Sequence, residues 1–496
     1  MIAAFQYGRE IGKETTMGQY PKLQMYIDGQ WCVGSEGRSQ DVIDPATEQV
    51  IGQLPHASKA DLDRALEAAE RGFQVWKNKT ALERSPIIRR IADLLRQRAS
   101  DIAFIMSTEQ GKVFSEALEE IEKGAEHFEW MAEEGKRAYG RIIPARSNGI
   151  RQVVMVEPVG PVAAFTPWNF PAASPIRKLS TALGAGCSII IKASEETPAS
   201  CMEVVRACVD AGVPAGVINL VFGVPSEISE YLIRSPIIRK VTFTGSVPVG
   251  KKLAELAAQE MKTCTMELGG HSPVLVFDDV DCTKVVNLVA KGKFRNAGQV
   301  CVSPTRFFVH ESIHQRFASE FAAVASGIKV GSGLDKTSQM GPLANPRRLE
   351  AMEKLTADVR MRGGKVAAGG ERIGNRGLFW RPTVFVDAPD EADVMRTEPF
   401  GPIASIVSFA SFEEAIARAN SVKYGLASYL FTRSAKTAAR VSEALQVGML
   451  AINNLSVSPP EAPIGGVKDS GYGREGGAEG LMQFMNVKYI SEGHLD

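Results

Sequence analysis

The chain has 496 residues, of which 44% are hydrophobic and 23% are charged. This balance is typical of a folded protein with a large core, and it excludes disordered, collagen-like and fibrous proteins. The 57 Lys and Arg residues equal the 57 Asp and Glu residues in number, so no net charge attracts the chain to nucleic acid or anionic lipid. A small-molecule ligand is therefore favoured, and the length suggests about two to four domains.

The cysteines, histidines and apolar runs exclude several further classes of protein. The seven cysteines form no CxxC pair and no regular framework, which favours a reducing, cytoplasmic compartment. No Cys, Asp or Glu lies at ligand spacing beside His310 and His314, so we expect no metal site. Residues 1–20 contain several charges and read as an N-terminal tail rather than a signal peptide. No apolar run is long enough to span a membrane.

The first third of the chain is rich in predicted helices. From Ser58 onward, apolar residues recur at three- and four-residue steps while charged residues fill the other positions, which predicts an amphipathic helix. A second helix is predicted at residues 86–98. The acidic stretch 109–137 predicts two more helices.

The pattern changes at Gly160 to short apolar runs bounded by Gly and Pro, which are typical of buried parallel strands. Helical stretches at 199–211 and 249–259 separate these runs, so the pattern predicts a doubly wound α/β sheet. After Asp278 the alternation starts again and predicts a second α/β domain. Its helices are expected near 283–297, 311–325 and 346–362, and its strands near 305–309, 383–386 and 403–408.

Three polar or nucleophilic residues lie where structure alone does not require them. Cys301 ends the segment FRNAGQVC, where a glycine turn after a helical stretch would expose the thiol; the common alternative is a small buried apolar residue. Asn169 in TPWNFP follows a strand directly, so its amide would face a cleft at the carboxyl end of the sheet unless it only satisfies the turn backbone. Glu267 heads ELGGHSP, where two glycines let a ligand approach; a helix-end carboxylate is the alternative.

Two further segments suggest a dinucleotide. TFTGSVPVG follows a strand and opens a helix, so Gly245 and Ser246 would seat a pyrophosphate at the helix N-terminus, although a plain glycine turn is the alternative. Lys192 ends a buried strand and Glu195 follows three residues later. A carboxylate there accepts hydrogen bonds from a ribose 2′-hydroxyl and repels a 2′-phosphate. Glu196 is a competing candidate for this role.

Taken together, these segments resemble the aldehyde dehydrogenase superfamily, from about Tyr26 to the C-terminus. The resemblance rests on eight motifs in order: DPATEQ (44–49), PWNFP (167–171), KASEETP (192–198), FTGS (243–246), ELGGHSP (267–273), GQVC (298–301), EPFGP (398–402) and PIGGVKDSGYGRE (463–475).

The resemblance implies an α/β fold of the aldehyde dehydrogenase type, with a Rossmann-type cofactor domain, an α/β catalytic domain and a small β flap for oligomerisation. We expect the NAD-binding domain at residues 21–144 and 160–267, the oligomerisation strands at 145–159 and 486–496, and the catalytic domain at 268–485. The resemblance also implies a homodimer or homotetramer.

The same resemblance assigns the chemistry. Cys301 would be the nucleophile that adds to the aldehyde carbon, and the Asn169 amide with the Cys301 backbone N–H would stabilise the oxyanion. Collapse of the adduct would expel hydride to the nicotinamide. Glu267 would deprotonate the water that hydrolyses the resulting thioester.

The resemblance also assigns the cofactor contacts. Glu398 and Phe400 correspond to nicotinamide-ribose contacts, while Trp168, Lys192 and Glu195 correspond to contacts on the adenosine side. Glu195 favours NAD as the cofactor, with NADP as a less favoured possibility.

Two arginines bear on the substrate. Arg177 lies eight residues after Asn169, and Arg295 lies six before Cys301, at places where relatives that take uncharged aldehydes tend to have bulky aromatics. Two guanidiniums that converge on a pocket favour a carboxylate, although each could instead pair with a local acid. Phe170 and Ser458, the latter in a loop expected to close the pocket, complete the predicted substrate-binding set.

The chain most resembles dehydrogenases of succinate semialdehyde and of α-ketoglutarate semialdehyde (2,5-dioxopentanoate), so the expected substrate is a small carboxylated aldehyde. A sulfonated aldehyde such as sulfolactaldehyde, or another small aldehyde, is the alternative substrate. A CoA-acylating semialdehyde dehydrogenase is a further alternative, against which the retained Glu267 argues. A non-catalytic protein on this fold would be expected to lack Cys301 or Glu267.

Overall fold

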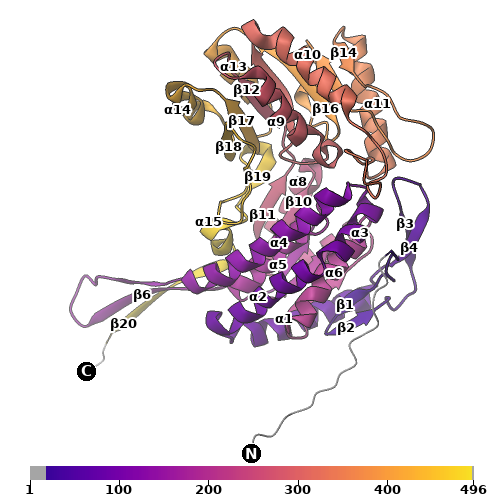
Figure 1. The fold of residues 1–496 in the computed structure, drawn as a ribbon. Helices are drawn as coiled ribbons and strands as arrows, with labels where there is room; N and C mark the ends of the chain where they lie inside the picture. The colour runs from indigo at the N-terminus through magenta and orange to yellow at the C-terminus, as the bar shows by residue number, and fades with distance from the viewer. Residues whose placement is uncertain (1–17, 494–496) are drawn as a thin grey trace, which may run out of the picture.

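The computed structural model describes residues 18–493, in which two large sheets lie one above the other, each covered by helices (Figure 1). Most of the predicted tail (1–17) and the end of the last predicted strand (494–496) lie outside the described residues. Each sheet has its own apolar core: one lies within residues 23–268 and adds Leu481 and Phe484, and the other lies within residues 274–464.

The first sheet has eight strands in the order β19-β11-β10-β7-β8-β9-β1-β2. These are β1 (Met25–Ile27), β2 (Gln30–Cys32), β7 (Val162–Phe165), β8 (Ile189–Lys192), β9 (Ile218–Val221), β10 (Lys240–Gly245), β11 (Thr263–Leu268) and β19 (Gly471–Tyr472). The strands from β11 to β9 are parallel, and helices α5 (Ala173–Ala185), α6 (Pro198–Asp210), α7 (Pro225–Arg234) and α8 (Val247–Gln259) connect them. The predicted doubly wound parallel sheet is confirmed.

The second sheet has seven strands in the order β14-β15-β16-β13-β12-β17-β18, and all but β14 are parallel. They are β12 (Ser272–Val276), β13 (Pro304–His310), β14 (Lys365–Ala368), β15 (Thr383–Val386), β16 (Ile403–Phe409), β17 (Ala427–Phe431) and β18 (Met449–Ile452). Its helices are α9 (Cys282–Phe294), α10 (Glu311–Gly327), α11 (Pro346–Met361), α12 (Asp393–Arg396), α13 (Phe412–Asn420) and α14 (Ala435–Ala444). The second predicted α/β unit is therefore present.

Four helices come before the parallel strands of the first sheet: α1 (Lys59–Lys77), α2 (Ala81–Gln97), α3 (Ala99–Gln110) and α4 (Phe114–Glu134). Helix α1 packs against β1, β8, β9 and α7, whereas α2, α3 and α4 pack against one another and against α5 and α6. Helix α1 starts as predicted, because Ser58 and Asp61 form a reciprocal capping box at its N-terminus. The prediction of two helices within 109–137 is wrong, because this stretch is the single helix α4 followed by a short 3-10 turn, η1 (Gly135–Arg137). Helix α3 precedes it and was not predicted.

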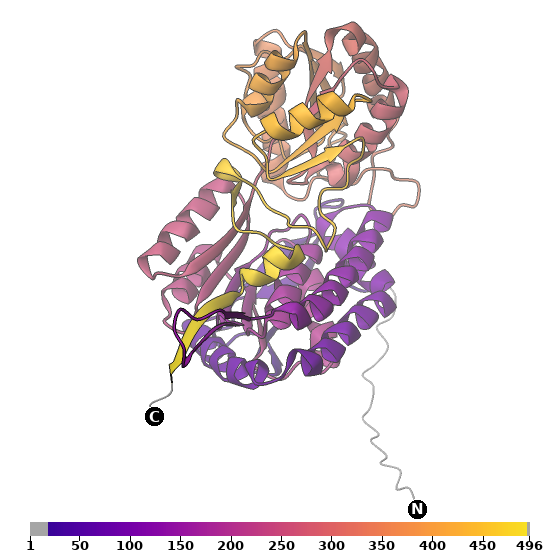
Figure 2. The same cartoon turned by 90° about the vertical axis from the view of Figure 1, so that its left-hand side faces the viewer.

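Two small sheets complete the fold. β5 (Arg141–Ile143), β6 (Ile150–Pro158) and β20 (Met485–Gly493) form an antiparallel ribbon that projects away from the body (Figure 1), and β3 (Ser39–Ile43) pairs with β4 (Val50–Pro55). Between β18 and β20 the chain passes from the second sheet to the first (Figure 2), through η3 (Lys468–Ser470), β19 and α15 (Gly477–Met482). The glycine-rich stretch 465–477 is accordingly mostly loop.

Candidate active site

The site lies where the strand order of the first sheet reverses. From β7 the chain goes to β8 and β9 on one side and then returns to β10 and β11 on the other. Ligands bind outside the carboxyl ends of parallel strands at such a reversal. Trp168 and Asn169 follow β7, and Gly245 and Ser246 end β10, so two of the predicted segments lie at this edge.

A tight turn presents Cys301. After α9, the 3-10 turn η2 (Arg295–Gly298) contains three consecutive residues in the left-handed region, with φ values of 50° at Asn296, 51° at Ala297 and 69° at Gly298. A Cβ at Gly298 would lie 2.1 Å from the Gly401 carbonyl oxygen, so only glycine fits there. The turn therefore ends the helix abruptly before Cys301, a half-buried residue whose thiol faces the protein interior.

The structure brings Asn169 to the cysteine turn. The Asn169 side-chain amide donates a hydrogen bond to the Gln299 carbonyl at 3.0 Å, and the Asn296 amide donates to the Asn169 carbonyl at 2.9 Å. Asn169 is only 4% exposed. Its amide is thus held two residues from Cys301, where a reacting carbonyl oxygen would need a donor.

The Cys301 thiol lies near a negative charge, Glu398, and a positive charge, Arg177. Burial, with a smaller contribution from the charge of Glu398, raises the pKa of the Cys301 thiol to about 12, while the Arg177 guanidinium opposes this rise. The resting side chain is therefore the neutral thiol, and a positive charge brought nearby would favour the thiolate.

Glu267 lies in β11 as a buried carboxylate that is 6% exposed. Among residues 18–493 its Oε1 has no hydrogen-bond donor. Burial, and then the charge of Glu475, raise the pKa of the Glu267 carboxyl well above its ordinary value. A carboxylate with an open lone pair and a raised pKa has the properties of a general base.

Lys178 and Glu475 adjoin Glu267 and were not predicted. The Lys178 ammonium donates to Glu475 at 2.6 Å and to Thr242 at 3.0 Å, inside the protein. Glu475 ends the motif PIGGVKDSGYGRE, so the sequence contained a signal for it. Lys178 carried no signal, because one lysine in an amphipathic helix looks like a solvated residue.

Glu398, Phe400 and Trp168 also meet here. Glu398 accepts a hydrogen bond from the Gly270 N–H at 3.2 Å, and a Cβ at Gly269 would lie 2.4 Å from its Oε2. Burial raises the pKa of the Glu398 carboxyl to about 8. The rings of Trp168 and Phe400 pack edge to face with centroids 5.4 Å apart.

The remaining predicted cofactor residues lie along the edge of the first sheet. Lys192, at the end of β8, forms an ion pair with Glu195, whereas the competing Glu196 pairs with Arg347. Ser246 precedes α8 without a side-chain capping bond, which leaves N–H groups of the first turn for a ligand. A free helix N-terminus beside a carboxylate at a strand reversal fits a dinucleotide.

Arg177 lies close enough to Cys301 for its charge to act on the thiol, and Arg295 lies near the carboxylates of Glu116 and Glu119. Among residues 18–493, neither guanidinium lies in an ion pair, and the Arg177 Nε is buried without an acceptor. The Arg295 guanidinium lies 5.4 Å from the centroid of the Phe170 ring. Ser458 is half-buried in the loop after β18, and the structure does not join it to either arginine by a hydrogen bond within the described residues.

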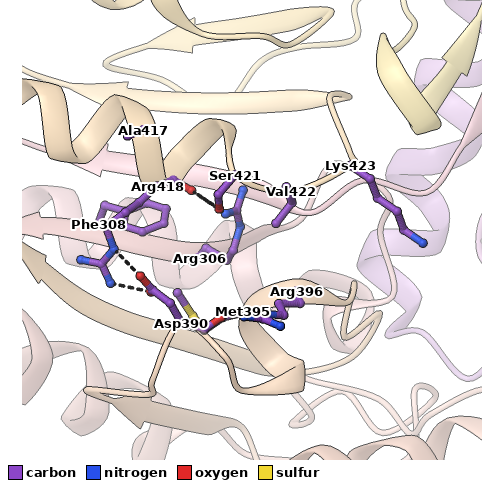
Figure 3. A pocket seen from close by; sticks show the side chains of 10 residues that line it. All are labelled: Arg306, Phe308, Asp390, Met395, Arg396, Ala417, Arg418, Ser421, Val422 and Lys423. Atoms are coloured by element: carbon purple, nitrogen blue, oxygen red, sulfur yellow. Dashed lines mark hydrogen bonds and ion pairs between the residues drawn. The ribbon is translucent and has the colours of Figure 1, made fainter.

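A separate cavity of about 570 Å³ lies beside the second sheet (Figure 3). Several of its charged side chains are already engaged: Arg418 pairs with Asp390 at 2.7 Å, and Arg306 donates to the carbonyls of His271 and Ala419. None of the predicted site residues lines this cavity. In the described part of the chain, no three His, Cys, Asp or Glu side chains gather to hold a metal.

Comparison with known proteins shows the family. Residues 31–490 match the aldehyde dehydrogenase family. The chain is 47% identical to 4-(hydroxymethyl)benzenesulfonate dehydrogenase of Comamonas testosteroni, over 94% of this chain and 97% of that protein. It is 40% identical to 3-sulfolactaldehyde dehydrogenase of Pseudomonas putida, over 96% and 98%.

Among solved structures, succinate-semialdehyde dehydrogenase of Burkholderia pseudomallei matches with a TM-score of 0.95 and 41% identity, over 97% of this chain and 100% of that one. Enzymes of this group use NAD or NADP. The match covers both sheets and every predicted motif. The chain belongs to the aldehyde dehydrogenase family.

Proposed function

We propose that this enzyme oxidises a small anionic aldehyde to the corresponding acid, with NAD as the preferred cofactor. The observation that carries the anionic substrate is the pair Arg177 and Arg295, two partly buried guanidiniums that form no ion pair within residues 18–493, although carboxylates lie close enough to feel their charge. Taking an arginine out of water costs free energy that a counter-ion normally offsets. A substrate anion would supply that counter-ion.

The residues around Cys301 support a two-step reaction. Cys301 would pass its thiol proton to Glu267, which would release it to solvent. The resulting thiolate would attack the aldehyde carbon, and the Asn169 amide with the Cys301 backbone N–H would hold the oxyanion. Bound NAD supplies the hydride acceptor. Glu267 would then take a proton from the water that attacks the thioester, which returns Cys301 as thiol and releases the acid. The buried Lys178–Glu475 pair adjoins Glu267, and the charge of Glu475 raises the pKa of the Glu267 carboxyl, which favours uptake of this proton.

The preference for NAD rests on Glu195. Its carboxylate lies beside Lys192 at the end of β8 and would accept hydrogen bonds from a ribose 2′-hydroxyl, while it would repel a 2′-phosphate. Glu398 and Phe400 would hold the nicotinamide ribose, and Trp168, in the loop after β7, packs against Phe400.

The expected anion is a carboxylate or a sulfonate, because each has at least two oxygens on one atom that can accept parallel hydrogen bonds from a guanidinium. Succinate semialdehyde and α-ketoglutarate semialdehyde are the carboxylated candidates. The sulfonated candidate is sulfolactaldehyde, for which one relative is named, while a second relative is named for an aromatic sulfonate. Transfer of the acyl group to CoA is the less favoured alternative, because Glu267, whose buried Oε1 has no donor among the described residues, would activate water at the thioester.

The test compares kcat/KM for succinate semialdehyde, α-ketoglutarate semialdehyde, sulfolactaldehyde and butanal, with NAD. We expect at least one anion to exceed butanal by about tenfold or more, which corresponds to about 1.4 kcal/mol of transition-state binding. Arg295→Gln should weaken this preference and leave butanal oxidation within about threefold. Arg177→Gln should lower turnover of the anions more than turnover of butanal, and it should slow butanal as well, because it also removes a positive charge that favours the thiolate. Arg90→Gln, at an exposed position on α2, is the control. Equal losses for anionic and neutral substrates would contradict an anion pocket.

A further inference from the structure

A buried ion pair lies behind the segment that carries Asn169. Lys112, in the turn between α3 and α4, is 2% exposed, and Glu120 on α4 is 3% exposed. The Lys112 ammonium donates to Glu120 at 2.5 Å and to the Asn169 carbonyl oxygen at 2.9 Å. It also lies 4.4 Å from the centroid of the Phe170 ring. Lys112 therefore holds the start of the segment.

Glu120 holds the other end of the same segment. Its Oε1 accepts hydrogen bonds from the backbone N–H groups of Ala172 at 3.0 Å and Ala173 at 2.9 Å, while its Oε2 accepts from Lys112. These N–H groups begin α5, whose own N-cap residue, Ala172, has no capping side chain. Glu120 thus caps α5 from a neighbouring helix, and its charge complements the positive end of the helix dipole.

The same face of α4 also holds the turn that carries Cys301. Glu116, one helical turn before Glu120, accepts a hydrogen bond from the Asn296 N–H at 2.9 Å, and the Asn296 amide donates to the Asn169 carbonyl. The Asn169 carbonyl therefore receives one donor from Lys112 and one from the cysteine turn. Both loops that meet at the reacting atoms are fastened to one helix.

Stability alone does not explain this pair. Replacement of a buried ion pair by apolar residues of similar volume is often neutral or stabilising, because removing two charges from water offsets their attraction. Here every bond that the pair makes outside itself goes to the backbone of residues 169–173. Small errors in the position of a catalytic donor cost large factors in rate.

We propose that Lys112 and Glu120 are positioning residues that set the Asn169 amide against Cys301, and that Asn169 depends on their bonds to residues 169–173 for oxyanion binding. This rests on the proposed function only in assigning the oxyanion to Asn169; neither Lys112 nor Glu120 need touch substrate or cofactor. The pair acts on any aldehyde, so it is independent of which anion the enzyme prefers.

The experiment uses the full-length enzyme with three variants, Lys112→Met, Glu120→Gln and the double variant. Lys112→Met leaves a buried Glu120 without its cation, so this variant is the one at risk of misfolding. The double variant removes both charges and guards against that outcome. Arg96→Met with Glu129→Gln, an exposed pair that also joins a neighbouring helix to α4, is the matched control.

We expect the double variant to fold, with kcat for butanal and for the preferred anion lowered by about tenfold or more. The Kd for NAD and the rate of iodoacetamide alkylation at Cys301 should stay within about threefold, because alkylation needs the thiol but no oxyanion donor. Glu120→Gln should retain part of the activity, since its amide oxygen can still accept from Ala172 and Ala173. The control pair should match wild type.

Two results would overturn the proposal: a folded double variant with wild-type kcat, or a loss of kcat matched by equal losses in NAD binding and in alkylation, which would mean general disorder of the site. Either result leaves the wild-type preference between anionic and neutral aldehydes unaffected. Conversely, an enzyme without anion preference would refute the proposed substrate class while butanal turnover still tests the pair.

Discussion

The reactivity of Cys301 depends on charges that the folded chain places around one thiol. Burial and the nearby Glu398 raise the pKa of this thiol to about 12, and Arg177 is the cation that opposes them. The thiolate fraction of such a group is small at neutral pH and grows about tenfold with each pH unit below the pKa. The cofactor-free enzyme should therefore be a slow nucleophile near pH 7.

This predicts a steep pH dependence of alkylation. In the absence of cofactor, the rate at which iodoacetamide modifies the Cys301 peptide, followed by mass spectrometry, should rise about tenfold per pH unit between about pH 7 and 9. Arg177→Gln should slow the reaction at each pH, because loss of that positive charge raises the thiol pKa further. A rate that levels off below pH 8 would show instead that the free enzyme already holds a thiolate.

At the scale of elements, the buried parallel strands after Gly160 carried the clearest sequence signal. Short apolar runs between Gly and Pro mark buried parallel strands, and those predicted after Gly160 are found as β7, β8, β9, β10 and β12, whereas β11 was not predicted. Helix α3 was not predicted because it packs between α4 and α6 and is buried on several faces, so its sequence lacks an amphipathic period. The boundary of α4 was misjudged because its charged residues continue into η1.

The residues of the candidate site differ in whether a local sequence motif marks them. Cys301, Asn169 and Glu267 lie in motifs that can be read locally, and the structure places them together. Lys178 and Glu475 pair across 297 positions of sequence. Lys112 and Glu120 are near in sequence, but their role becomes apparent only from their hydrogen bonds with the backbone of Asn169 and Ala172. Contacts between residues that are far apart in the sequence leave no local sequence pattern.

The turn before Cys301 gives a prediction for glycine geometry. Gly298 has φ of 69°, and its Cβ would lie 2.1 Å from the Gly401 carbonyl oxygen, whereas Gly374 has φ of 66° and open space around a Cβ. Both Gly→Ala changes impose the left-handed cost of about 1–2 kcal/mol, but only Gly298→Ala adds a backbone clash. Gly298→Ala should thus lower the free energy of unfolding more than Gly374→Ala and should alone reduce kcat; equal effects in denaturation and turnover assays would contradict the clash.

At the scale of the whole molecule, the end of the chain ties the two sheets together. From β18 in the second sheet the chain returns to pair β19 with β11 and to place Glu475 beside Lys178 (Figure 2). Glu267 on β11 and Cys301 before β13 belong to different sheets. The site therefore forms only when both sheets are folded and docked. In the part of the chain that the structure describes, no helix is long and apolar enough to cross a bilayer.

The projecting ribbon of β5, β6 and β20 predicts self-association. It exposes Ile142 (75%), Val487 (66%) and Tyr489 (54%) on strands that extend from the body, and β20 is an edge strand with no second partner among residues 18–493. Exposed apolar edge strands of this length are normally covered by another chain.

Light scattering coupled to size exclusion at micromolar concentration should therefore give a homodimer or homotetramer. Ile142→Lys with Val487→Lys should shift the mass toward monomer, because each added charge would have to be desolvated in the interface. Leu82→Lys, which changes a 72% exposed residue on α2, should leave the mass unchanged. A monomeric wild-type enzyme, or an oligomer that tolerates both ribbon changes, would place the interface elsewhere and leave the ribbon without a partner.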